Sequence, residues 1–148
     1  MHTRTAARVV FVVVGLSPWL LTLARAWRLL GEDAGPLDSV FSAICHRLPE
    51  RTLRLAGVVM PLCSRCAGIF AGLAAAALVG WPADARPRAR RGWLLSAGLC
   101  MVVDVIARAA GPYPGGHATR LATGFAFGYA LAVGLLPPRA APTSSLDA

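Results

Sequence analysis

The chain alternates four long apolar runs with shorter polar and charged segments. The runs cover 9–24, 66–83, 92–107 and 121–138, and a single charged residue, Asp104, interrupts them. Two runs have 16 residues and two have 18. At about 1.5 Å per residue, 18 helical residues extend about 27 Å, close to the thickness of the hydrocarbon layer of a bilayer. The pattern therefore predicts four transmembrane helices.

We expect an all-α integral membrane protein, a bundle of four transmembrane helices with one long outer loop between the first two. With their flanking turns, the predicted helices span about 9–30, 64–83, 92–108 and 119–138. They form a single membrane domain, 1–141. The small, polar residues of 142–148 predict a disordered tail.

Composition agrees with membrane insertion and excludes other classes of protein. Hydrophobic residues make up 56% of the 148 residues and charged residues 15%, where a soluble domain usually has about a quarter charged. Mean hydropathy is +0.58. Such a chain is too apolar to stay disordered, and it has too little polar surface to solvate a four-helix bundle in water. The first run resembles a signal peptide, but Arg25 in the cleavage-like segment and three further runs favour a retained helix.

The positive charge indicates an orientation in the membrane. All 15 basic residues are arginine, against 7 acidic residues, for a net charge of +8. The arginines outside the runs lack interleaved aromatic residues, so we expect the lipid bilayer and no nucleic acid as partner. Four of them follow the second run, at Arg86, Arg88, Arg90 and Arg91. The positive-inside tendency then places this loop and both termini in the cytoplasm, in a multi-pass protein of the cell membrane.

Four crossings of the membrane bring the chemically reactive side chains to one face. The long loop, the starts of the second and fourth helices and the end of the third all lie opposite the termini. This predicted outer side holds Cys45, His46, Cys63, Arg65, Cys66, Asp104, Arg108, His117 and Arg120. We therefore expect the functional site at the outer face.

The sharpest motif on that side is Cys45-His46, followed after 16 residues by a Cys-x-x-Cys pair, Cys63 and Cys66. Three thiols and an imidazole are enough ligands for tetrahedral zinc or another thiophilic metal. A helix beginning near Cys63, with Arg65 beside it, would favour the thiolate form. Because consecutive side chains diverge, Cys45 and His46 are less easily ligands together. A redox or structural disulfide and inert packing are the two other interpretations.

Asp104 is the charged residue that interrupts an apolar run, and an unpaired carboxylate inside a membrane-spanning helix costs of the order of a few kcal/mol. Arg108 lies one helical turn further on, and Arg120 begins the next helix. We expect Asp104 and Arg120 to form a pair that supports the site. Such a pair could equally tie the third and fourth helices together or take part in catalysis or ion relay.

The segment between the cysteines alternates charged with apolar residues and predicts a short interfacial helix. Its polar side is a solvated surface or an anion site. The residues expected to support the metal or redox site are Arg47, Glu50, Arg51, Arg65, Asp104 and Arg120. A third functional class is an enzyme acting on a lipid headgroup, with Arg47, Arg51 and Arg65 holding phosphate and Asp104 as base. The sequence has no nucleophile–base pair that supports this third class.

Two pairs of glycines, Gly68 with Gly72 and Gly124 with Gly128, are spaced four residues apart within apolar runs. Small residues at this spacing let two helices approach closely in lipid. We interpret them as packing positions within the bundle.

Two segments around the cysteines resemble a known family. They are CHRLPER at 45–51 and MPLCSRCAGIF at 60–70, and the resemblance extends through Asp104 to RLATG at 120–124. The family is catalogued as domain of unknown function 2085 and consists of small prokaryotic predicted membrane proteins. The resemblance implies a multi-span membrane protein with a shared set of Cys, His, Arg and Asp residues, and it implies no particular activity.

Overall fold

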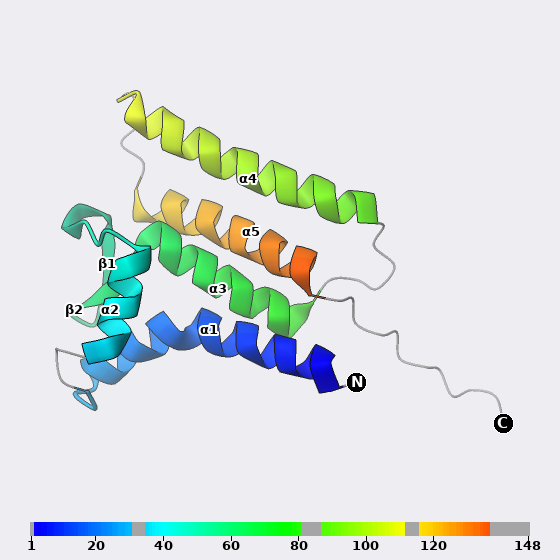
Figure 1. The fold of residues 1–148 in the computed structure, drawn as a ribbon. Coiled ribbons are helices and arrows are strands. Elements are labelled where there is room, and N and C mark those ends of the chain that lie inside the picture. The colour runs from blue at the N-terminus through cyan, green and yellow to red at the C-terminus, as the bar shows by residue number, and fades with distance from the viewer. Residues whose placement is uncertain (1, 31–34, 81–86, 112–115, 137–148) are drawn as a thin grey trace.

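The computed structural model describes residues 2–30, 35–80, 87–111 and 116–136, and these form a helical bundle with a small hairpin at one end (Figure 1). The long helices are α1 (His2–Ala26), α3 (Ser64–Val79), α4 (Pro87–Ala109) and α5 (His117–Leu135). Between α1 and α3 lie α2 (Gly35–Ile44), a 3-10 turn (Pro49–Arg51) and the strands β1 (Thr52–Leu55) and β2 (Val58–Cys63). The chain is therefore mostly helical, with two short strands that the all-α prediction did not include.

The four long helices lie side by side in the order α1, α3, α5, α4 (Figure 1). Each runs opposite to the long helix before it in the chain, so α3 and α5 are parallel neighbours. One end of the bundle holds the start of α1 and the end of α5. The other end holds α2, the hairpin, the starts of α3 and α5 and the end of α4.

Within the described part of the chain, three helical segments are long and apolar enough to cross a membrane: Thr5–Ala26, Pro87–Ala109 and His117–Leu135. The apolar helix α3 has only 16 residues, so the prediction of four spans is supported for three helices. Large apolar side chains cover the outside of the bundle, among them Val13, Leu20, Leu95, Leu99, Ile106 and Leu135. An apolar surface of this extent fits a lipid environment.

The helix ends differ from the predicted spans. The first helix ends at Ala26 rather than at 30, because Arg28 takes a left-handed conformation (φ 56°) that terminates the helix. Helix α4 begins at Pro87 rather than at 92, which is possible because proline is well tolerated in a first turn. The parts of the predictions that lie outside the described residues are the helix ends 81–83 and 137–138 and the tail 142–148.

The segment predicted as one long loop contains a helix and a hairpin. Strands β1 and β2 pair antiparallel, and the two residues that join them, Ala56 and Gly57, both have positive φ, 48° and 82°. This is the backbone of a type I′ turn, whose twist matches that of a hairpin. Since β2 passes directly into α3, the hairpin fixes the position of the first turn of that helix.

The two parallel helices α3 and α5 touch along their glycines. A Cβ atom at Gly68, Gly72, Gly124 or Gly128 would overlap a backbone carbonyl oxygen of the opposite helix, for Gly72 that of Phe125. The predicted role of these glycines in close helix packing is confirmed. The contact holds the starts of α3 and α5 next to each other, at the hairpin end of the bundle.

Candidate metal centre

Cys63 and Cys66 lie at the junction of β2 and α3. Cys63 has extended backbone angles (φ −67°, ψ 159°) and caps the helix, while Cys66 belongs to the first helical turn. The side chain of a helix cap lies close to the backbone of the residue three positions on. This local geometry brings the two thiols to the same place.

Cys45 reaches this place from the end of α2. It is buried in an apolar cluster with Leu21, Phe41 and Leu62. The backbone N–H of Cys63 donates a hydrogen bond to Sγ of Cys45, with a nitrogen–sulfur distance of 3.3 Å. A donor of this kind stabilises negative charge on the sulfur.

The three thiols form one group. The Sγ atoms of Cys45, Cys63 and Cys66 all lie within 4.8 Å of one another. Zinc binds thiolates at about 2.3 Å in a tetrahedron, which puts its sulfur ligands about 3.8 Å apart. Movements of about 1 Å would therefore complete such a site. Three sulfur donors without a carboxylate are a ligand set that suits a thiophilic metal.

His46, the fourth predicted ligand, stands apart from the three thiols. Its side chain is exposed and does not belong to the close group. It lines the same cavity of about 190 Å³ as Cys45, Cys63 and Cys66, together with Arg47. The structure thus gathers three of the predicted ligands, and the divergence of consecutive side chains explains why His46 lies outside the close group although it borders the same cavity.

The pKa of Cys63 is lowered to about 5. The largest cause is the Cys66 thiol, which donates to the Cys63 sulfur, and the backbone N–H groups of Arg65 and Cys66 and the Cys45 thiol act in the same direction. Burial opposes them. Cys63 is therefore a thiolate at neutral pH, the form that binds metals and attacks disulfides.

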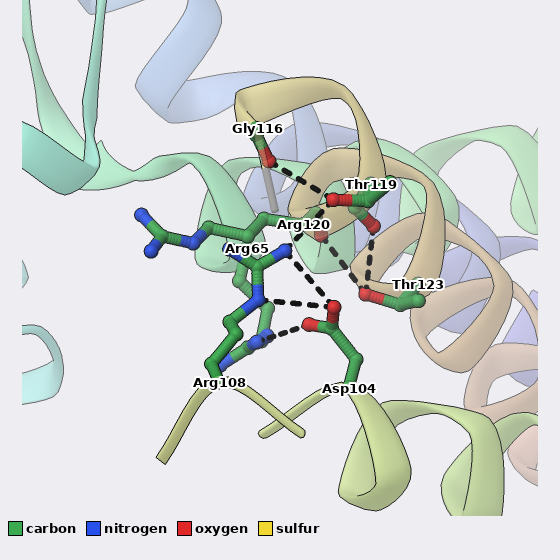
Figure 2. Close-up of polar contacts among 7 residues, drawn as sticks. All are labelled: Arg65, Asp104, Arg108, Gly116, Thr119, Arg120 and Thr123. Atoms are coloured by element: carbon green, nitrogen blue, oxygen red, sulfur yellow. Dashed lines mark hydrogen bonds and ion pairs between the residues drawn. The ribbon is translucent and has the colours of Figure 1, made fainter. Parts of the chain in front are cut away.

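A buried ion-pair network lies beside the thiols (Figure 2). The Asp104 side chain on α4 is 8% exposed, and its Oδ2 accepts a hydrogen bond from Arg65 at the start of α3. Its Oδ1 accepts from Nε and Nη2 of Arg108 at 3.0 and 2.9 Å. Nη2 of Arg108 also donates to Oγ1 of Thr119 in α5, at 2.7 Å. The network thus links the ends of three helices.

These contacts differ from the predicted pair of Asp104 with Arg120. Among the described residues, the ion pairs of Asp104 are to Arg65 and Arg108, and the Arg120 side chain extends away from it (Figure 2). The reason is the order of the helices, which places the first turn of α3 within reach of the end of α4. No local pattern in the sequence marks Thr119 or the Arg65 contact, because Arg65 and Asp104 are 39 residues apart. With both oxygens of Asp104 held by guanidinium groups, the structure does not favour a role for it as a base.

The remaining predicted residues lie on the turn before β1. Glu50 and Arg51 form an exposed ion pair at 3.7 Å. Arg47 has a left-handed backbone (φ 47°) and contributes to the cavity around the thiols, as does Arg51. These arginines therefore border the candidate metal centre rather than forming a separate helical face.

Comparison with known proteins gives the family. Residues 45–133 match the family described as "Predicted membrane protein (DUF2085)", so the match covers more than half of the chain and includes the three grouped thiols and Asp104. The chain belongs to the DUF2085 family. The predicted resemblance is confirmed.

Two relatives of this DUF2085 protein are named as uncharacterised proteins. An uncharacterised protein of Methanocaldococcus jannaschii is 30% identical over 134 residues, which cover 86% of this chain and 83% of that protein. An uncharacterised protein of Methanothermobacter thermautotrophicus is 56% identical over 32 residues, 22% of this chain and 29% of that protein. No solved structure matches the chain.

Proposed function

We propose that this DUF2085 protein is a multi-span membrane protein that binds a thiophilic metal ion, such as zinc, through Cys45, Cys63 and Cys66. The observation that carries the proposal is the convergence of three sulfur atoms from two distant segments to within 4.8 Å. The low pKa of Cys63 supplies one of the thiolates that a metal requires, and the backbone N–H of Cys63 holds the Cys45 sulfur beside it. The fourth coordination position of the metal is occupied by His46, which lines the same cavity, or by a solvent molecule.

The bound metal would supply a cross-link between the end of α2 and the junction of β2 with α3. Such a cross-link stabilises a short hairpin that buries little surface of its own. Three protein ligands with one open position are also the pattern of zinc sites that bind an exchangeable ligand. With His46 as the fourth ligand the site is purely structural, and with solvent in that position it also keeps one exchangeable position for a small molecule.

We further propose that all four long helices cross the cell membrane as a single domain, 1–141, with the metal site outside. The alternating directions of the four helices support this, because an even number of crossings returns the chain to its starting side (Figure 1). Arg88, Arg90 and Arg91 lie at the end of the bundle opposite the thiols, where the positive-inside tendency expects the cytoplasm. Helix α3 has 16 residues and extends about 24 Å, which spans a locally thin bilayer.

Metal content of the purified protein tests the metal proposal. The full chain is purified under reducing conditions without added metal, and bound metals are measured by mass spectrometry. We expect about one equivalent of a thiophilic metal, lost on Cys66→Ser and retained on the control Cys100→Ser, since Cys100 is exposed on α4 away from the group. Less than about a tenth of an equivalent in the parent protein, unchanged by Cys66→Ser, would contradict the proposal.

A thiol–disulfide function is the second candidate, and the low pKa of Cys63 favours it. A thiolate that caps a helix, with a second cysteine three residues on, is the arrangement of dithiol oxidoreductases. Alkylation of freshly lysed cells followed by mass mapping distinguishes it from metal binding. A redox function predicts a fraction of Cys63–Cys66 disulfide that grows with mild oxidant, whereas thiols that stay reduced throughout would eliminate it.

A further inference from the structure

A second cavity lies beside the candidate metal centre, at the hairpin end of the bundle. It has a volume of about 240 Å³ and is lined by Arg51, Cys63, Arg65, Val105, Arg108, Ala109 and Arg120. Four of these residues are arginines, and they come from four segments: the turn before β1, α3, α4 and α5. Cys63 also lines the cavity around the thiols, so the two cavities adjoin.

Positive charge exceeds negative charge around this second cavity. Asp104 is bound by Arg65 and Arg108, and Glu50 lies 3.7 Å from Arg51 in a pair whose side chains are both more than half exposed. Two carboxylates and the Cys63 thiolate against four guanidinium groups leave an excess of one positive charge at the cavity. Like charges held close together are unfavourable unless an anion lies between them.

Arg120 is the lining arginine whose guanidinium group has no protein partner among the described residues. None of the hydrogen bonds and ion pairs among the described residues involves its guanidinium group, and its side chain is half-buried. In Figure 2 it extends away from the Asp104 network and from Thr119. A partly buried guanidinium group requires acceptors from outside the protein, because burial without them is costly.

Two helix ends add to the positive potential. The helices α3 and α5 are parallel and both begin at this end of the bundle, α3 at Ser64 and α5 at His117 (Figure 1). The first backbone N–H groups of a helix carry partial positive charge and favour anions nearby. The cavity therefore combines arginine side chains with two helix N-termini.

We propose that this cavity binds a phosphate-type oxyanion through Arg51, Arg65 and Arg120. Guanidinium groups bind two oxygens of such an anion at once, which makes arginine well suited to it. A volume of about 240 Å³ is below the range of about 300–1,000 Å³ for drug-sized ligands, so the occupant is a free oxyanion or the headgroup phosphate of an anionic lipid. The proposal does not depend on metal binding, because the thiols are not its ligands.

The test uses the full chain and two sources of phosphate. Binding of radiolabelled inorganic phosphate is measured by equilibrium dialysis in detergent, and retained lipid is measured by native mass spectrometry from nanodiscs of phosphatidylcholine with or without phosphatidylglycerol. The variants are Arg120→Gln and the exposed Arg51→Gln. The matched control is Arg54→Gln, an exposed arginine on β1 that lines neither cavity. Size-exclusion chromatography and circular dichroism check that each variant folds.

Either of two results would support the site, and they identify its ligand. Phosphate binding that weakens about tenfold or more in Arg120→Gln and Arg51→Gln but not in Arg54→Gln indicates a free anion. Retention of phosphatidylglycerol that is lost in the same two variants, without phosphate binding in detergent, indicates a lipid headgroup. If neither arm separates Arg51→Gln from Arg54→Gln, the proposal is overturned, whether or not Arg120→Gln folds.

Discussion

Cys63 connects the chemistry of the site to the local fold. As the last residue of β2 and the cap of α3, it places its sulfur next to Cys66 and its N–H against Cys45. Its side chain also lines both cavities at this end of the bundle. A single position therefore organises the thiol group, and the state of its sulfur determines what the group can bind.

The first prediction concerns the reactivity of that sulfur. Because the pKa of Cys63 is lowered to about 5, its thiolate persists at neutral pH and is lost only as the pH falls through that value. In metal-free protein, iodoacetamide should alkylate Cys63 at a rate that is half-maximal near pH 5, as followed by peptide mass mapping. Glutathione is the reference, since the rate for an ordinary thiol falls below about pH 8.5. A Cys63 profile that coincides with that of glutathione would contradict the prediction.

A second prediction at this scale concerns Asp104. Its carboxylate compensates two largely buried guanidinium groups, so Asp104→Asn leaves Arg65 and Arg108 without their counter-charge. We expect a loss of about 3–5 kcal/mol in the free energy of unfolding. Chemical unfolding in detergent, followed by circular dichroism, measures it. Glu50→Gln is the control, because the exposed Glu50–Arg51 pair contributes about 1 kcal/mol at most, and equal effects of the two variants would refute the role given to Asp104.

At the scale of elements, the contact between α3 and α5 positions the site. The glycines on both helices let their backbones meet, and this aligns the first turn of α3 with the first turn of α5. At the other end of the bundle, Tyr129 of α5 joins the same two helices by donating to the carbonyl of Gly80, after the last residue of α3, at 2.7 Å. Arg90 of α4 donates to the carbonyls of Val133 and Leu136, the latter at 2.9 Å, and so holds α4 against the end of α5. Both ends of the pair are thus fixed.

The third prediction tests this contact. In Gly72→Ala the new Cβ would overlap backbone atoms of α5, so the two helices must separate. We expect a loss of about 1–3 kcal/mol in unfolding free energy and a lower melting temperature. Gly92→Ala on α4 is the matched control, since a Cβ there meets open space. Identical melting temperatures for the two variants would show that the helices are not in contact at Gly72.

The elements also show which parts of the structure a sequence can predict. Long apolar runs indicated the cores of α1, α3, α4 and α5, because a run of that length has few alternatives to a helix. The hairpin was missed, since strands of four and six residues are too short for their alternation to differ from a loop. The paired glycines predicted a close contact, but not which helices would be neighbours.

At the scale of the whole molecule, the alternating directions of four helices predicted which residues lie at the same end of the bundle. It placed Cys45, Cys63, Cys66 and Asp104 at one end, and the structure does so too. Which residue of another helix pairs with Asp104 depends on the lateral order of the helices, which no local pattern encodes. The sequence therefore predicted Arg120 as the partner, whereas in the structure the partner is Arg65. Contacts between residues far apart in the sequence can be identified only from the packed structure.

The fourth prediction concerns the orientation of the molecule. A membrane-impermeant maleimide applied to intact cells should label Arg54→Cys on the hairpin, and should label Arg88→Cys at the start of α4 only after permeabilisation. Both positions are exposed, and peptide mapping separates their label from that of the native cysteines. The opposite pattern would place the thiols in the reducing cytoplasm and exclude the proposed outer site, though not the metal.

The central claim is that three cysteines bind one metal ion, and X-ray absorption spectroscopy tests it most directly. On protein purified with its metal, we expect a zinc edge whose nearest shell contains three sulfur atoms at about 2.3 Å and one nitrogen or oxygen at about 2.0 Å. In Cys45→Ser, which removes the ligand from a separate segment, we expect most of the metal to be lost, as in Cys66→Ser, and the metal that remains to have at most two sulfur neighbours. A metal shell made of nitrogen and oxygen alone, unchanged by Cys45→Ser, would contradict the account.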